Sequence, residues 1–188
     1  MRDEVAVTEL TVSADVIDDG DRIADHADAL VGLQSLKAVT KLPDDCTGLA
    51  RYAYGRAGHE LMPADGTRGT NGVTAIWYAA KQKKALHKRT PEPGDLVFFK
   101  ETYDRDRDGR RDDGLTHIGV VESIEADGTV VFVHRSGRGV TKERLNPRRP
   151  KDKTVNDWLR MRSRAGPAAL TGELFAGYAS WDVILGGR

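Results

Sequence analysis

Asp44-Asp45-Cys46-Thr47-Gly48-Leu49 marks the point where a polar loop turns into an apolar helical pattern, and it contains the only cysteine of the 188-residue chain. The pattern continues to Gly58, with an apolar stripe formed by Leu49, Ala50, Ala53, Tyr54 and Ala57. A thiol at the first turn of a helix faces unpaired backbone N–H groups and the positive end of the helix dipole, which lower its pKa. We therefore predict that Cys46 is a nucleophile with a lowered pKa, rather than a small apolar side chain of the core.

Two histidines follow on apolar, β-branched runs. His117 lies within residues 116–124 and His134 within residues 129–135, and the turn-forming pair Asp127-Gly128 separates the two runs. This pattern predicts two antiparallel strands joined by a tight turn. An imidazole on such a strand can act as the base that a cysteine nucleophile requires.

The length of the turn decides which residues of the two predicted strands pair. If the turn has two residues, His134 faces Val121; if it has four, His134 faces Gly119. Side chains alternate along a strand, so His117 and His134 share one face of the sheet in either register. In the second register the two histidines are diagonal neighbours, about 7–8 Å apart between backbones, and Gly119 leaves room for one ring to approach the other. A hydrogen bond between the rings is then feasible.

The rest of the chain predicts further helices and one more strand. Apolar residues at helical spacing indicate helices over 21–32, over 73–87 and over 170–185, the last from the positions of Phe175, Tyr178, Trp181 and Ile184. Asp21 is the expected cap of the first of these helices. A short apolar strand, 96–99, follows Pro93-Gly94. Helices followed by antiparallel strands predict an α+β fold.

Length and charge favour a single domain without nucleic acid as its partner. We expect an acidic leader at 1–20 and one domain over 21–188, with an insertion at 103–114 and a C-terminal extension from about residue 147. Lys and Arg together equal Asp and Glu together, at 29 each, so no net charge favours a nucleic acid. No apolar run predicts a membrane span, and no secretory signal is expected in the printed chain. The oligomeric state is not indicated.

Three stretches of the chain, in this order, resemble one known family. They are Asp45-Cys46-Thr47-Gly48-Leu49, Pro93-Gly94-Asp95-Leu96-Val97-Phe98-Phe99 and Thr116-His117-Ile118-Gly119-Val120-Val121. They are similar to the nucleophile motif, the central strand and the base strand of the NlpC-type, papain-like cysteine peptidases that cut bacterial cell-wall peptides, to which the CHAP amidases are related. The resemblance implies a papain-like α+β fold in which N-terminal helices carrying the nucleophile pack on an antiparallel β-sheet.

The same resemblance implies roles for individual residues. Cys46 is then the nucleophile, His117 the general base and His134 the residue that orients the base. Asp45 and Thr47 are expected to contact the substrate, although a carboxylate at the position of Asp45 equally suits a helix cap. The Tyr-x-x-Gly-Gly stretch that the family often has before the nucleophile is absent, so the resemblance supplies no tyrosine for the substrate site.

An aspartate-rich stretch just before His117 predicts a calcium site. Its alternating carboxylates turn at a glycine, as in loops that gather hard oxygen ligands around one cation. The expected ligands are the side chains of Asp104, Asp106, Asp108 and Asp112 together with the carbonyl of Arg110. The calcium loop of an EF-hand ends in a glutamate that binds the ion through both carboxylate oxygens. Leu115 occupies that position here, so we expect the calcium loop to lie within a β-hairpin instead. A solvated loop in which arginines neutralise the aspartates is the alternative.

These features predict a cysteine peptidase that hydrolyses amide bonds in peptidoglycan stem peptides through Cys46, His117 and His134. Catalysis needs no cofactor, and calcium would be structural. An N-acetylmuramoyl-L-alanine amidase of the CHAP type and a non-catalytic, calcium-stabilised wall-binding module are the alternatives. The resemblance further implies a location in the cell envelope or outside the cell, peptidoglycan peptides as the partner, and a possible inhibitor or immunity protein.

Overall fold

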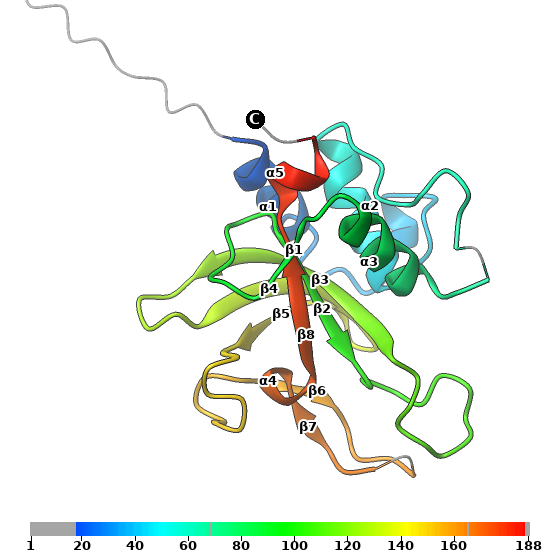
Figure 1. Ribbon diagram of the computed structural model, residues 1–188, viewed down its shortest axis with the longest axis vertical. Helices are drawn as coiled ribbons and strands as arrows, with labels where there is room; N and C mark the ends of the chain where they lie inside the picture. The colour runs from blue at the N-terminus through cyan, green and yellow to red at the C-terminus, as the bar shows by residue number, and fades with distance from the viewer. Residues whose placement is uncertain (1–17, 68, 165, 187–188) are drawn as a thin grey trace, which may run out of the picture.

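The computed structural model describes residues 18–67, 69–164 and 166–186, so most of the predicted acidic leader lies outside the described residues (Figure 1). In chain order, its elements are α1 (Asp19–Asp28), a short 3₁₀ helix (Leu36–Ala38), α2 (Cys46–Arg56), α3 (Gly72–Gln82), β1 (Leu86–His87), β2 (Leu96–Lys100), β3 (Leu115–Ile124), β4 (Val130–Ser136), β5 (Gly139–Leu145), β6 (Trp158–Arg160), β7 (Ala169–Leu170), α4 (Thr171–Leu174), β8 (Phe175–Ala179) and α5 (Trp181–Ile184). Within this part of the chain, no helix combines the length and the apolar character that crossing a bilayer requires.

A six-stranded antiparallel sheet forms the centre of the fold. Its strand order is β1-β8-β2-β3-β4-β5, so the last strand in the sequence lies inside the sheet, between β1 and β2. A separate pair, β6 and β7, lies with α4 at the lower end of the view in Figure 1. The predicted α+β class is confirmed.

The helices cover one face of this sheet. Alternate residues of the central strands, among them Phe98, Ile118 and Val133, point toward α1, α2 and α3 and are fully buried. Burying one such side chain contributes about 1.5–3 kcal/mol relative to leaving it exposed. The helix that begins at Cys46 is therefore fixed against β3 and β4 by its apolar stripe, as the sequence predicts.

The intervening residues of the same strands form a second core on the other face. Phe99, Phe132 and Tyr178 are buried there, and Leu174 of α4 packs against them. Because apolar residues cover both faces, the central strands read as nearly continuous apolar runs. Leu96-Val97-Phe98-Phe99 is the clearest of these runs, and all four residues are buried.

The hairpin of β3 and β4 adopts the second of the two predicted registers near the histidines. Val120 pairs with Val133 and Val121 pairs with Phe132, and an irregularity follows toward the turn. The space beside Gly119 is filled differently from our expectation. A Cβ added there would lie 2.7 Å from the ring of Phe132, so the glycine makes room for this phenylalanine rather than for an imidazole.

Two of the predicted helices have wrong boundaries. The first begins at Asp19 and ends at Asp28, because Asp18, not Asp21, caps it: the Asp18 carboxylate accepts the N–H of Asp21 at 2.9 Å. The helix predicted over 73–87 ends at Gln82. Lys84 adopts a left-handed conformation, with φ of 61°, and the chain continues as β1 paired with β8.

The continuous helix predicted over 170–185 is also wrong, because strand β8 separates two short helices, α4 and α5. A bulge explains the misleading spacing: Phe98 pairs with Gly177 while Phe99 pairs with Phe175, so one extra residue lies between the two pairs. Phe175 and Tyr178, three positions apart, therefore meet on one face with ring centroids 4.7 Å apart. A bulged strand thus reproduces the spacing of a helix. Only Trp181–Ile184 is helical in its second half.

Two glycines of α2 give a matched test of how tightly the helix start is packed. A Cβ on Gly48 would lie 1.8 Å from the carbonyl oxygen of Pro43, whereas nothing lies within 4 Å of a Cβ on Gly55. We expect Gly48→Ala to lower the free energy of unfolding by about 2–3 kcal/mol through overpacking. Gly55→Ala should raise it by about 0.5–1 kcal/mol, because alanine loses less backbone freedom. Urea denaturation measures both changes, and equal stability of the two variants would contradict this packing.

Candidate active site

A cleft of about 370 Å³ opens where the start of α2 meets the sheet. Cys46 and His117 both line it, so the structure brings together the predicted nucleophile and the predicted base from positions 71 residues apart in the chain. The other lining residues come from the first turns of α2 and α3, from loops and from the ends of β3 and β4, and they are Asp44, Asp45, Thr47, Asn71, Gly72, Val73, Tyr103, Thr116, Arg135, Ser136 and Gly137.

The thiol of Cys46 is placed at the helix start as predicted, but its pKa is not lowered. Burial raises the pKa of Cys46 to about 12. Backbone N–H groups of Ile118, Cys46 and Thr47 act in the opposite direction, and the negative charge of Asp45 adds to the rise. The expectation of a lowered pKa is therefore wrong for this geometry, because desolvation outweighs the helix start. Cys46 is a neutral thiol that needs a base.

His117 and His134 form the hydrogen bond that the hairpin register made feasible. His117 Nε2 and His134 Nδ1 lie 2.6 Å apart, and the two rings are nearly perpendicular, at 85°. Burial, together with the neighbouring His134, lowers the pKa of His117 well below its ordinary value. Since Nε2 of His117 is turned toward His134, Nδ1 is the nitrogen left to accept a proton in the cleft.

His134 is fully buried and is held from its other side by the next strand, β5. Its Nε2 lies 3.1 Å from the hydroxyl of Thr141 and 3.4 Å from the carboxylate of Glu143. Arg138 donates to the same carboxylate oxygen at 2.7 Å. If His134 donates through Nε2, its Nδ1 must accept from His117, which fixes the tautomer of both rings. Sequence reasoning missed Glu143. The turn residues Gly137-Arg138-Gly139 after β4, followed by a β-branched pair, could have predicted the strand that carries it.

Asp45 and Thr47 lie in the wall of the cleft, where both serve the helix start. One oxygen of Asp45 accepts the N–H of Gly48 at 2.9 Å, which makes Asp45 the cap of α2. The hydroxyl of Thr47 donates to that same oxygen at 2.7 Å, and the Thr47 side chain is buried against Gly72. The cap, which the sequence left as one alternative for Asp45, is thus present. Substrate contact by either residue stays a prediction.

Two further residues of the cleft were not expected from the sequence. Tyr103 is 53% exposed and lines the cleft from the loop between β2 and β3. Arg135 is held by Asp44, whose pKa lies far below its usual range because the guanidinium and the N–H of Leu36 both donate to it. The only feature of the sequence that could have indicated Tyr103 is its position as an aromatic residue directly before an acidic stretch.

The predicted calcium loop forms the connection between β2 and β3, as a hairpin setting requires. Carboxylate oxygens of Asp104, Asp106 and Asp108 lie within 4.8 Å of one another. Asp112 is not part of this group. The geometry is compatible with three of the five predicted ligands, and calcium binding stays a prediction.

The comparisons with known proteins identify the family. The CHAP domain matches residues 39–136, just over half of the chain, and this stretch contains Cys46, His117 and His134. This chain belongs to the CHAP domain family. No curated protein matches the sequence. The resemblance to NlpC-type and CHAP proteins drawn from the sequence is confirmed at the level of the family.

Two solved structures are similar to this CHAP domain. A Staphylococcus aureus subsp. aureus Mu50 protein, described as similar to a lipoprotein of the NLP/P60 family, shares 18% identity over 86% of this chain and 41% of its own, with a TM-score of 0.44. NlpC1 of Trichomonas vaginalis shares 24% identity over 69% of this chain and 40% of its own, with a TM-score of 0.39. The chain thus spans about two fifths of the length of these two proteins.

The histidine pair makes a prediction about pH dependence. Because the pKa of His117 is lowered, the ring stays neutral and able to accept a proton below pH 6.5, so we expect the acid limb of kcat/KM to lie below 6.5. Glu143→Gln removes a negative charge that favours the protonated pair. It should shift this limb further down and lower kcat about tenfold, with KM little changed.

Glu92→Gln, at an exposed position outside the cleft, is the control for loss of a carboxylate. It should leave both kcat and the acid limb unchanged. A Glu143→Gln variant that loses activity equally at every pH, with no displacement of the limb, would show that Glu143 only supports the fold.

The aspartate loop makes a separate prediction about calcium. Binding of the cation to the native state raises its stability by mass action, so millimolar calcium should increase the melting temperature. The triple variant Asp104→Asn, Asp106→Asn, Asp108→Asn should lose this increase. Differential scanning calorimetry with calcium and with chelator makes the comparison, and a native protein that melts at the same temperature in both would exclude the site.

Proposed function

We propose that this CHAP domain is a cysteine hydrolase that cleaves amide bonds in peptidoglycan stem peptides. One observation carries the proposal: Cys46 at the start of α2 and His117 line the same cleft, and His117 is hydrogen-bonded from behind to the buried His134. Membership of the CHAP family supports a hydrolase of the cysteine peptidase or amidase type. The choice of a stem peptide as substrate rests on the family resemblance.

The mechanism begins with proton transfer, because Cys46 is neutral in the free protein. As the sulfur attacks the amide carbonyl, His117 Nδ1 accepts the thiol proton, so that the negative charge develops only when a partner is present. The backbone N–H groups of Cys46 and Thr47 lie close to the thiol at the start of α2, where they would stabilise the developing oxyanion. His117 then donates its proton to the leaving amine, and an acylated Cys46 remains.

Hydrolysis of the thioester completes the cycle. His117, neutral again, takes a proton from water as the water attacks the acyl carbon, and it returns that proton to the sulfur as the thioester breaks. His134 acts through His117 rather than on the substrate. Because its Nδ1 accepts from His117, it holds the base in the tautomer that leaves Nδ1 free, and it shares the positive charge of each protonated intermediate.

The cleft also supports a way of holding the substrate. Tyr103 offers an exposed aromatic face near Cys46, whereas the guanidinium of Arg135 is paired with Asp44 and shapes the wall of the cleft. Asp45 is available for an amino group only through the oxygen that does not cap α2. These contacts favour a peptide with a charged amino group over an apolar substrate.

An amidase that cuts between the sugar and the peptide is the second candidate, since the CHAP family match suits it equally. A binding module without turnover is the third. All three would act at the cell wall, which supports a location in the envelope or outside the cell, and an inhibitor or immunity protein would be a natural partner for a hydrolase of this kind.

Digestion of purified sacculi tests the proposal and separates the candidates. We expect mass spectrometry to find cleaved stem peptides; intact released stems would identify the amidase, and wall binding without products would identify the module. Cys46→Ala should lower the rate at least about a thousandfold, because the nucleophile is lost. His117→Ala should do the same, whereas His59→Ala, outside the cleft, should retain full activity. Undiminished hydrolysis by Cys46→Ala would refute the proposed chemistry.

A further inference from the structure

A second cavity, of about 330 Å³, lies at the other end of the β3–β4 hairpin from the histidine pair. It shares no lining residue with the cleft of Cys46. Val130, at the start of β4, forms part of it, and His134 is four residues further along the same strand, about 13 Å away at the rise of a β-strand. The cavity is therefore separate from the proposed catalytic centre.

Three cations and no acid line this cavity. Lys88 and Arg89 come from the segment after β1, and Arg148 comes from the segment after β5. The remaining lining residues are apolar or neutral, and they are Thr90, Pro91, Gly128, Val130, Pro147, Phe175 and Tyr178. Of the carboxylates nearby, Asp127 pairs with Arg149, and the buried Asp95 accepts from the N–H groups of Glu92 and Trp181 and contacts His87. The cavity thus has an uncompensated positive charge.

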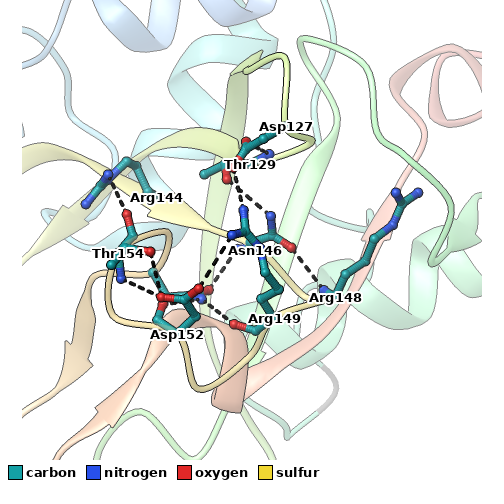
Figure 2. Close-up of polar contacts among 9 residues, drawn as sticks. Asp127, Thr129, Arg144, Asn146, Arg148, Arg149, Asp152 and Thr154 are labelled. Carbon is teal, nitrogen blue, oxygen red and sulfur yellow. Dashed lines mark hydrogen bonds and ion pairs between the residues drawn. The ribbon is translucent and has the colours of Figure 1, made fainter.

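The side chain of Arg148 is placed differently from those of its neighbours Arg144 and Arg149. Arg144 pairs with Asp157, and Arg149 pairs with Asp127 and Asp152. The side chain of Arg148 extends away from this network toward β8, although its backbone N–H is held by Asn146 at 3.2 Å (Figure 2). Among the described residues no carboxylate pairs with its guanidinium. The network therefore fixes the backbone of Arg148 and leaves its charge to the cavity.

Arg89, on the opposite side, is held without loss of charge. Its guanidinium donates to the hydroxyl of Ser180 at 3.1 Å, which is a neutral partner, and further N–H groups of the fork remain for a ligand. Lys88 beside it is exposed, and within the described part of the chain no acid pairs with it. The lining of the cavity thus combines these cationic donors with apolar residues.

The floor of the cavity contains a polar group that the protein does not satisfy. Tyr178 is 1% exposed, and its hydroxyl has no hydrogen-bond partner among the described residues. Burial and the charge of Asp95 raise its pKa, so it stays protonated and can only be useful as a donor or a neutral acceptor. A buried hydroxyl without a partner costs about 1–3 kcal/mol, so its presence in a fold requires a reason.

We propose that this cavity binds an oxyanion, a phosphate or a carboxylate group of a cell-wall polymer, between Arg148, Arg89, Lys88 and the hydroxyl of Tyr178. Phosphate and carboxylate oxygens match the guanidinium fork, and Phe175 and Val130 add apolar surface beside the contact. Binding at this site would keep the domain attached to the polymer while a bond elsewhere in the polymer occupies the Cys46 cleft. The proposal does not depend on hydrolysis by Cys46.

Titration with inorganic phosphate, followed by NMR chemical-shift changes on the Cys46→Ala protein, tests the site directly. We expect Arg148→Ala to weaken phosphate binding about tenfold, because it removes a charge-assisted contact. Arg56→Ala, which removes an equally exposed arginine at the far end of α2, is the matched control and should bind as the parent does. Equal affinity of all three proteins, or shift changes that do not centre on Tyr178, would overturn the proposal.

Tyr178→Phe separates a ligand from a trapped water. If the hydroxyl serves a ligand, this variant should keep or increase the free energy of unfolding without phosphate, because an unsatisfied group has been removed, and it should bind phosphate several times more weakly. If urea denaturation shows it to be destabilised and phosphate binding is unchanged, a water satisfies the hydroxyl and the proposed contact is wrong.

Sacculi distinguish the two sources of the oxyanion. Arg148→Ala should bind less to intact sacculi than the parent does. If removal of the phosphate polymers by hydrofluoric acid abolishes this difference, the ligand is a phosphodiester; if the difference persists, the ligand is a carboxylate of the peptidoglycan. Equal binding of Arg148→Ala and the parent to both preparations would show that the cavity has no role at the wall.

Discussion

The antiparallel pairing of β3 with β4 is the constraint on which the site depends. It places His117 and His134 on one face with their ring nitrogens 2.6 Å apart, and it buries Ile118 and Val120 of the same strand against the helices on the other face. A shift of one residue in this pairing would exchange the two faces. The base would then point into the helical core, and the apolar residues that fix α2 would be lost at the same time. Stability and site geometry are therefore set by one register.

Burial determines the chemistry of the proposed centre more than charge does. Desolvation raises the pKa of the Cys46 thiol and lowers that of the His117 imidazole, so the resting state holds both groups neutral. An isolated thiolate would not be stable there. Each group can be charged only when the other is charged too, or when a substrate provides the partner, and this favours proton transfer coupled to attack on the carbonyl. Behind His117, the buried His134 lies 3.4 Å from the Glu143 carboxylate, whose negative charge favours a protonated histidine pair.

The sequence correctly predicted those elements whose local pattern is compatible with only one type of secondary structure. The cap at Asp45 and the stripe from Leu49 predicted α2 within two residues, and the apolar runs around His117 and His134 predicted their strands and the face they share. The errors arose where one pattern has two physical causes. The spacing of Phe175 and Tyr178 comes from a bulge in β8, and Asp18, Asp19 and Asp21 are all suitable caps for α1. The strand β5, which carries Glu143, has little apolar alternation, so the turn before it and its β-branched pair were its only sequence signals.

The sequence by itself predicted the helix start at Cys46 and the common face of the two histidines, because a helix cap, an apolar period and strand parity are local properties. Only the tertiary structure decided the environment of these groups. The burial that keeps Cys46 neutral, the approach of Glu143 from β5, the reach of Tyr103 into the cleft and the unpaired charge of Arg148 all arise from contacts between segments distant in the chain. Such contacts depend on packing, which no single stretch of sequence encodes. The chain therefore specifies its reacting residues locally and their electrostatics only as a folded whole.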